Sequence, residues 1–267
     1  MVSPAANSPG AVSHATPPLP AGVRRPSPFL LALYYIAVRI RVGWNFQSLR
    51  IANSERFPAG PGPLIVFGNH PSWWDPVPAL LAHHAYRPES IFWAPSDTEV
   101  MKQNGYLRYL GFFPVKTGTI AGTKQFLQSA SDLLTRQDTV LWVTPAGELH
   151  DPRERPVRFR RGLAALVSGL ENVTVVPMAL EYPFWDTQRP EMLVSWGEPI
   201  HIADGRSKST GEWHQLFQEA LATAQDELAE LSIAREANRF RVLFYGHAGL
   251  RNLLRLIRSL GPLFRRR

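Results

Sequence analysis

The chain has 267 residues, 45% of them hydrophobic, which is enough to bury the core of one large α/β domain or two small ones. It contains no cysteine, which excludes disulfides, thiolate metal sites and cysteine nucleophiles. The formal charge is +7, but nine of the 29 Lys and Arg and only one of the 22 Asp and Glu follow residue 234. The basic character therefore belongs to the C-terminal tail, because the preceding residues carry a net charge of −1.

The N-terminal part predicts a leader followed by a surface helix. Residues 1–28 hold seven of the 24 prolines among Ala, Ser and Gly, a composition typical of a disordered leader. Residues 29–38 are apolar but run into Arg39 and Arg41, so they are too short to cross a membrane and predict an amphipathic helix that lies in its surface. No signal-peptide cleavage pattern follows, so we expect an intracellular protein.

The middle of the chain alternates short apolar strands with helices. Strands are predicted at 64–67, 91–94, 112–115, 140–144, 173–180 and 192–196, and helices at 77–84, 99–109, 121–136, 163–170 and 213–231. Strands that are apolar on both faces and separated by helices are typical of an α/β fold with a mostly parallel sheet and helices on both faces. Ligands of such sheets bind beyond the carboxyl ends of the strands, so the polar residues found there are the candidates for a site.

The C-terminal end predicts a basic amphipathic helix over 250–260. Its leucines fall on one face and its arginines on the other, a pattern that favours an anionic membrane surface over nucleic acid. We therefore divide the chain into a leader (1–28), one domain with its N-terminal helical element (29–234) and a tail (235–267).

A histidine and a carboxylate follow the first predicted strand. His70 comes after Gly68 and Asn69, and Asp75 lies five positions further on. Such a pair can act as a general base, because the carboxylate holds the imidazole tautomer and stabilises its positive charge. The alternative is a helix start, with Asp75 at the N-cap and Pro76 at the first helical position.

Four sequence blocks lie at the ends of predicted strands or in the adjoining loops. The first is Asn69, His70 and, after four residues, Asp75. The others are the Gly-Phe-Phe-Pro-Val-Lys of 111–116, the Thr-Pro-Ala-Gly-Glu-Leu-His of 144–150 with the Phe-Arg-Arg-Gly of 159–162, and the Val-Pro-Met-Ala of 176–179. Together these four blocks resemble the glycerolipid acyltransferase family, which acylates acceptors such as 1-acylglycerol 3-phosphate. The resemblance covers residues 60–200 with its blocks in the family's order.

This resemblance implies a glycerol-3-phosphate acyltransferase-like fold and transfer of a fatty acyl group from a thioester to a lipid hydroxyl. His70 is then the general base and Asp75 orients it. The implied substrate-binding residues are Asn69, Lys116, Gly147, Glu148, Arg160 and Arg161. The donor is acyl-CoA or acyl carrier protein, with no permanently bound cofactor and no metal. We expect a cytoplasmic enzyme at the membrane surface that acts in phospholipid biosynthesis, with lipid, thioester and acyl carrier protein as partners and no nucleic acid.

The third block departs from the family's Phe-Pro-Glu-Gly-Thr-Arg-Ser. Ala146 replaces the glutamate, and Leu149 and His150 fall where Thr-Arg is expected, so a non-phosphorylated acceptor such as a glycolipid or a carotenoid glycoside is an alternative. The arginines of 151–161 either contact phosphate or form surface pairs with Asp151 and Glu154. A non-catalytic membrane-binding protein with the same fold is the alternative from another class.

Two tryptophans and one acidic residue near these blocks each have two possible roles. Trp73 and Trp74, between the proposed base and its carboxylate, are either part of the core or the lining of an acyl channel. Glu148 either orients a base or caps the turn that follows its strand.

Overall fold

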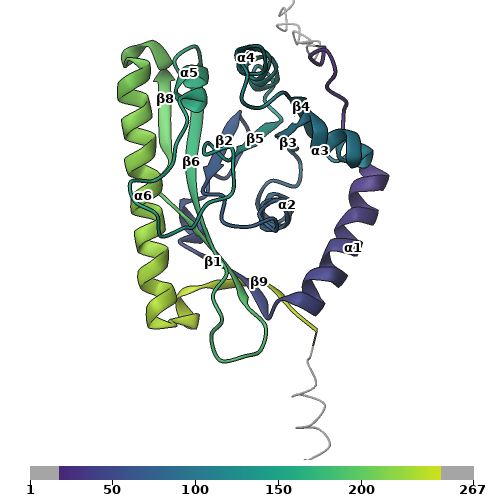
Figure 1. Ribbon diagram of the computed structural model, residues 1–267, viewed down its shortest axis with the longest axis vertical. Coiled ribbons are helices and arrows are strands. Elements are labelled where there is room, and N and C mark those ends of the chain that lie inside the picture. Colours follow the sequence, from purple (N-terminus) through teal and green to yellow (C-terminus); the bar gives the residue numbers. More distant parts are fainter. Residues whose placement is uncertain (1–17, 248–267) are drawn as a thin grey trace, which may run out of the picture.

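The computed structural model describes residues 18–247, in which a central sheet lies between two layers of helices (Figure 1). The strands are β1 (Ser48–Ala52), β2 (Leu64–Gly68), β3 (Ile91–Asp97), β4 (Phe112–Val115), β5 (Thr139–Val143), β6 (Glu171–Glu181), β7 (Glu191–Trp196), β8 (Ile200–Asp204) and β9 (Arg241–Tyr245). The helices are α1 (Pro28–Asn45), α2 (Pro76–Tyr86), α3 (Thr98–Gln103), α4 (Ile120–Leu134), α5 (Gly162–Val167) and α6 (Thr210–Ala234). Short 3-10 helices are η1 (Ser54–Arg56), η2 (Gly105–Tyr109), η3 (Gly205–Ser207) and η4 (Ala237–Arg239).

The strand order is β4-β3-β5-β2-β6-β7-β1-β9, and β8 also pairs with β6. The pairings from β4 to β6 are parallel, whereas β7 and β8 run antiparallel to β6. β1 is parallel to β7, and β9 closes that edge antiparallel to β1. The predicted mostly parallel α/β sheet is therefore confirmed. Its parallel half brings the carboxyl ends of β2, β3, β4, β5 and β6 to one edge.

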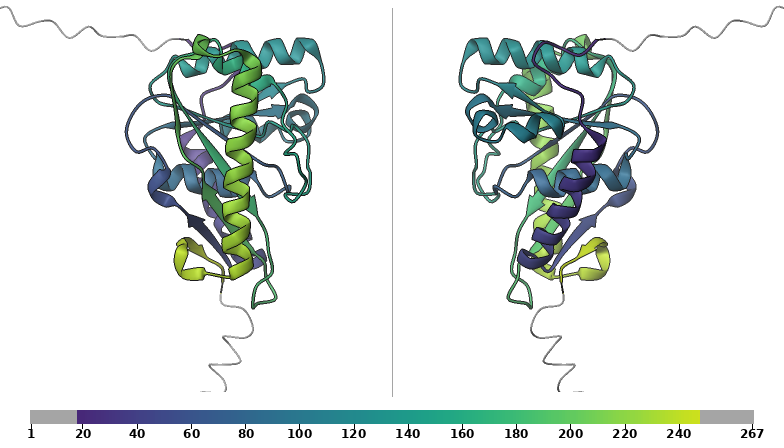
Figure 2. Two further views of the ribbon diagram at one scale, coloured as in Figure 1. Left: turned by 90° about the vertical axis from the view of Figure 1, so that its left-hand side faces the viewer. Right: turned by 90° about the vertical axis from the view of Figure 1, so that its right-hand side faces the viewer.

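Both faces of the sheet are buried, as strands that are apolar on both sides require. On β2, Leu64 and Val66 face a core formed with α1, α2 and α3, while Ile65 and Phe67 face a second core formed with α4, α5 and α6. Figure 2 shows α6 and α1 on opposite sides of the molecule. The active-site candidates of the first block follow the strand that both cores enclose.

Several predicted boundaries change in the structure. The helix expected over 99–109 is interrupted at Asn104, where α3 ends and η2 begins, and α5 stops at Val167, before the expected 170. Strands β1, β8 and β9 were not predicted, because each has five residues and carries polar or charged side chains within it. Short strands of this kind depend on their pairing partners and leave little pattern in the sequence.

Both predicted domain limits are also corrected. The expected leader reaches too far, because Val23 packs in the second core and Ser27 caps α1 and donates its N–H to the carbonyl of Tyr109. The expected tail begins too early, because β9 pairs with β1. Residues 1–17 and the helix predicted over 250–260 lie outside the described residues. Within residues 18–247, no helix is both long enough and apolar enough to span a bilayer.

Candidate active site

The loop that leaves β2 is anchored on the neighbouring strand β6. At Gly68 a Cβ atom would lie 2.8 Å from the carbonyl oxygen of Met178, so the two backbones approach too closely for any side chain. Asn69 then bridges to Leu180, with its amide donating to the carbonyl at 3.0 Å and its oxygen accepting from the N–H at 2.8 Å. In this structure the buried amide of Asn69 holds the loop, and its predicted contact with substrate stays a prediction.

His70 and Asp75 meet as the first block predicts. Nδ1 of His70 lies 2.5 Å from Oδ2 of Asp75, which also accepts the N–H of Ser72 at 3.1 Å. Since a carboxylate only accepts, the proton is on Nδ1 and the lone pair of the neutral ring is on Nε2. The side chain of Asp75 is 3% exposed and that of His70 is 24% exposed. The pair thus has a buried carboxylate and an imidazole edge that a substrate can reach.

The alternative role of Asp75 as a helix cap is only half correct. Asp75 stands at the N-cap of α2 and Pro76 occupies the first turn, as expected. However, the carboxylate makes no hydrogen bond to the first turn of the helix. An N-cap side chain stabilises a helix by accepting such a bond, so the Asp75 carboxylate serves the histidine instead.

Tyr182 is a member of the site that the sequence analysis did not find. Its hydroxyl donates to Oδ1 of Asp75 at 2.6 Å, and the burial of this hydroxyl together with the charge of Asp75 raises the pKa of Tyr182 well above 10. The signal available in the sequence was its position, directly after the strand that carries the fourth block.

The third block forms a turn against His70. The N–H of His150 donates to the carbonyl of His70 at 3.0 Å, which places the ends of β5 and β2 side by side. Gly147 has a φ of +72°, and its N–H donates to the carbonyl of Thr144 at 3.0 Å. The guanidinium of Arg160 lies 3.2 Å from where a Cβ at Gly147 would be. Gly147 and Arg160 are thus brought together next to the first block.

Three arginines of the following loop (151–161) are paired with carboxylates. Arg153 binds Asp151 at 2.6 Å, and Arg158 binds Glu154 at 2.7 Å, which is the surface pairing considered from the sequence. Arg158 also reaches Glu148 at 3.2 Å, so the Glu148 carboxylate is engaged with this arginine. Arg155 pairs with Asp226 of α6.

Lys116 and Arg161 are not brought to the histidine. Lys116 is exposed at the end of β4, three strands away from β2, or about 14 Å at the usual strand spacing. Arg161 is exposed at the N-cap of α5, facing His214 of α6, whose pKa is lowered by burial and by this cation. Their predicted substrate contacts need movement or a ligand long enough to reach them.

The two tryptophans have different surroundings. Trp73 is 70% exposed and lies outside the core. Trp74 is partly buried. Its ring centroid lies 5.0 Å from that of Phe46 in an edge-to-face arrangement, and the Arg41 guanidinium lies 5.6 Å from the Trp74 centroid. Packing therefore explains Trp74 but not Trp73, which presents a large apolar surface beside the His70–Asp75 pair.

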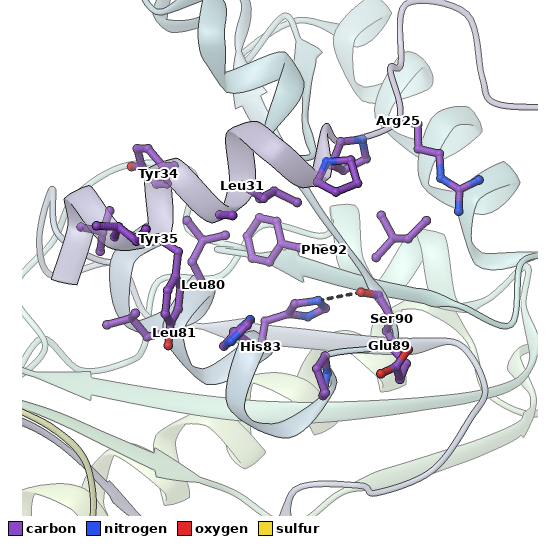
Figure 3. Close-up of a pocket in the computed structure, with 18 residues that line it drawn as sticks. Arg25, Leu31, Tyr34, Tyr35, Leu80, Leu81, His83, Glu89, Ser90 and Phe92 are labelled. Carbon is purple, nitrogen blue, oxygen red and sulfur yellow. Dashed lines mark hydrogen bonds between the residues drawn. The ribbon is translucent and has the colours of Figure 1, made fainter.

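An apolar cavity of about 600 Å³ lies between α1, α2 and the start of β3 (Figure 3). Its lining includes Leu31, Tyr35, Leu80 and Phe92, and His83, whose Nε2 lies 3.0 Å from the Ser90 carbonyl. His83 stands eight residues beyond Asp75 in α2, about 12 Å along the helix. His70 and Asp75 are not among the residues that line this cavity.

Within residues 18–247, no three histidine or acidic side chains gather as a metal site would require.

A family model described as Acyltransferase matches residues 48–181, half of the chain. A 1-acyl-sn-glycerol-3-phosphate acyltransferase of Streptococcus pneumoniae (strain ATCC BAA-255 / R6) is 24% identical over 156 residues, which are 57% of this chain and 55% of that protein. The chain thus spans about half the length of this curated relative. The residues matched by the family model include all four blocks.

Proposed function

Because this chain belongs to the acyltransferase family, we propose that it transfers a fatty acyl group from a thioester to the hydroxyl of a lysophospholipid. The observation that carries the proposal is the His70–Asp75 pair, in which Nδ1 contacts a buried carboxylate while the imidazole side chain is partly exposed. The relative's name, 1-acyl-sn-glycerol-3-phosphate acyltransferase, supports a lysophospholipid as the acceptor.

The proposed reaction needs one base and no covalent enzyme intermediate. Nε2 of His70 takes the proton of the acceptor hydroxyl while the oxygen attacks the thioester carbonyl. The tetrahedral intermediate then collapses, the carbon–sulfur bond breaks, and the leaving thiolate receives the proton from the imidazolium. Asp75 stabilises the imidazolium between these steps, as a buried carboxylate does in other histidine-based enzymes. The donor is acyl-CoA or acyl carrier protein, neither of which stays bound.

Arg160 is our candidate for the phosphate contact of the acceptor. It lies against Gly147 in the turn that touches His70, whereas the neighbouring Arg153 and Arg158 already bind carboxylates. A guanidinium can bind phosphate through two parallel hydrogen bonds. Lys116 and Arg161 are less direct candidates because they are not brought to the His70–Asp75 pair.

A neutral acceptor, such as a glycolipid or a carotenoid glycoside, is the second candidate. Ala146 stands where the family has a glutamate and is buried, so it offers no polar group to a glycerol phosphate. The pairing of Arg153, Arg155 and Arg158 with carboxylates also leaves fewer cations for a phosphate. Both observations favour an acceptor that carries less negative charge.

We further propose that α1 holds the protein on the membrane surface. Its outward face is apolar along the whole helix, and Phe29 and Trp44 at its two ends are 75% and 69% exposed. The other members of this stripe are Leu33, Ile36 and Ile40. Arg39 and Arg41 flank the stripe, so apolar burial and attraction to anionic lipid act together. The contact of Arg41 with Trp74 places this face next to the proposed active site.

The test of the proposed function is an acyl-transfer assay with the full chain. Acyl-CoA and acyl carrier protein thioesters are offered with lysophosphatidic acid or with a neutral glycolipid, and His70→Ala is measured beside the wild type. We expect transfer by the wild type and its loss in His70→Ala, both in the assay and in the total lipids of expressing cells. Equal activity of the two proteins would contradict the proposal, and so would a wild type that acylates none of the acceptors.

A further inference from the structure

The carboxylate of Asp75 is bound through both of its oxygens. Oδ2 accepts from Nδ1 of His70 and from the N–H of Ser72, while Oδ1 accepts from the hydroxyl of Tyr182 at 2.6 Å. A carboxylate on which only one oxygen is held can rotate about its terminal torsion, which is broad. The tyrosine therefore completes the restraint that keeps Oδ2 on the histidine.

The position of Tyr182 is set by the same strand that anchors the histidine loop. Tyr182 follows β6 by one residue, and two residues before it Leu180 binds both ends of the Asn69 amide. Its ring packs 5.9 Å from that of Phe46, the first residue after α1. The hydroxyl is thus placed by β6 on one side and by α1 on the other, independently of α2, which carries Asp75.

The hydroxyl also remains a donor over the working pH range. Burial and the charge of Asp75 raise the pKa of Tyr182 well above 10, so this phenol is not ionised near neutral pH. A protonated phenol has one proton to donate, and the structure directs it at Oδ1. Removing that donor leaves one oxygen of a buried carboxylate without a partner among the described residues, which is costly for a charged group.

We propose that Tyr182 is a positioning residue for acyl transfer, acting through the Oδ1 oxygen of Asp75 to keep His70 aligned with the acceptor hydroxyl. This inference rests on the proposed function. Tyr182 does not touch the reacting atoms in this role. It determines how much of the time the Asp75–His70 contact is made, and therefore the rate of the chemical step rather than substrate binding.

The test compares Tyr182→Phe with Tyr86→Phe. Phenylalanine keeps the ring and removes only the hydroxyl, and Tyr86 supplies a matched control because its hydroxyl is also buried but lies at the far end of α2. We expect Tyr182→Phe to lower kcat about 10-fold or more, the size of a lost hydrogen bond to a charged group, with KM within about twofold. Its pH–rate profile should shift on the acidic side, whereas Tyr86→Phe should leave kcat, KM and the profile unchanged.

A purely structural role predicts a different result. In that case kcat per folded molecule stays within about twofold of the wild type and the pH profile does not move, even if thermal unfolding shows a lower Tm. That result would overturn the inference. A rise in KM at unchanged kcat would do the same, because it would assign Tyr182 to substrate binding.

A spectroscopic readout separates this inference from the proposed function. The proton between Nδ1 of His70 and Oδ2 of Asp75 gives a low-field NMR resonance that needs no substrate. We expect that resonance to shift or broaden in Tyr182→Phe and to stay in place in Tyr86→Phe. An unchanged resonance in Tyr182→Phe overturns the positioning role whether or not acyl transfer is detected, while an inactive wild type with a shifted resonance contradicts only the proposed function.

Discussion

Asp75 begins helix α2, yet its carboxylate binds the imidazole of His70 at 2.5 Å and makes no bond to the helix it begins. The same residue thus satisfies the local preference for Asp before Pro at a helix start and a tertiary contact with a loop from β2. A substitution that keeps the shape of the side chain but removes its charge distinguishes the role in the helix start from the role in holding His70.

Asp75→Asn should keep the fold and lose acyl transfer. Asparagine begins helices as well as aspartate does, but it has no charge to stabilise the imidazolium. Its NH₂ group cannot accept the hydrogen bonds that one of the two carboxylate oxygens of Asp75 accepts. We expect turnover to fall by roughly 10² to 10⁴, as for the loss of a positioned base, with a cooperative thermal transition retained. Near-normal turnover would show that the carboxylate matters only for the helix.

Asn69→Ala should reduce stability rather than substrate affinity. The substitution leaves the N–H and carbonyl of Leu180 without their buried partner, at a cost of about 1–3 kcal/mol for each unsatisfied group. Urea unfolding measures the change. Asn45→Ala is the matched control, because that amide donates to the Arg41 carbonyl on an exposed surface and should cost far less. Equal effects of the two substitutions would argue against the anchoring role of Asn69.

Arg160→Gln should weaken the use of a phosphorylated acceptor. We expect KM for lysophosphatidic acid to rise about 10-fold, as for the loss of one charge-assisted contact, with KM for a neutral glycolipid unchanged. Arg153→Gln serves as the control in the same loop, because its guanidinium already binds Asp151, whose pKa this arginine lowers. Should both variants behave alike, or should the neutral acceptor be preferred by the wild type, the phosphate role of Arg160 is lost.

Substituting the outward face of α1 should release the protein from membranes. We expect the pair Ile36→Asp and Ile40→Asp to abolish flotation with anionic vesicles, because both side chains are exposed and their change leaves the core intact. Ile233→Asp is the control, since this isoleucine is exposed on α6, across the sheet from α1.

The contribution of the C-terminal arginines is measured with a chain that ends at His247. Such a truncation keeps β9 in the sheet, whereas one at residue 234 would remove a strand. If truncation abolishes vesicle binding, and high salt abolishes the binding of the full chain in the same way, the electrostatic attraction belongs to the tail.

Full vesicle binding by the variant with Ile36→Asp and Ile40→Asp would refute the membrane role of α1.

The folded protein should lose stability between pH 6.5 and 4 through His83. Burial lowers the pKa of His83 from 6.5 to about 4, so over this range the unfolded chain binds a proton that the folded chain does not. Stability therefore falls as the pH drops, by about 3 kcal/mol across the whole interval. His83→Gln, which can still donate to the Ser90 carbonyl, should remove most of this pH dependence in urea titrations, whereas His84→Gln at the exposed neighbouring position should retain it.

The pattern of apolar and polar residues was sufficient to predict the layered α/β fold and the His70–Asp75 contact. Strands apolar on both faces require cover on both sides, and a histidine and an aspartate joined by one short loop meet with little help from the rest of the chain. The turn of the third block and the strand of the fourth were also visible, because each combines a buried strand with a glycine or proline at a defined place.

The side chains that surround that pair could not be predicted in this way, because they are brought there by strand pairing. Tyr182 is separated from Asp75 by 107 positions and reaches it because β6 pairs with β2, a register that no local pattern encodes. The same pairing uses the amide of Asn69, which the block pattern assigned to substrate, while the strand order leaves Lys116 at the far side of β3. Local preferences act over a few residues, whereas these contacts follow from packing between strands distant in sequence.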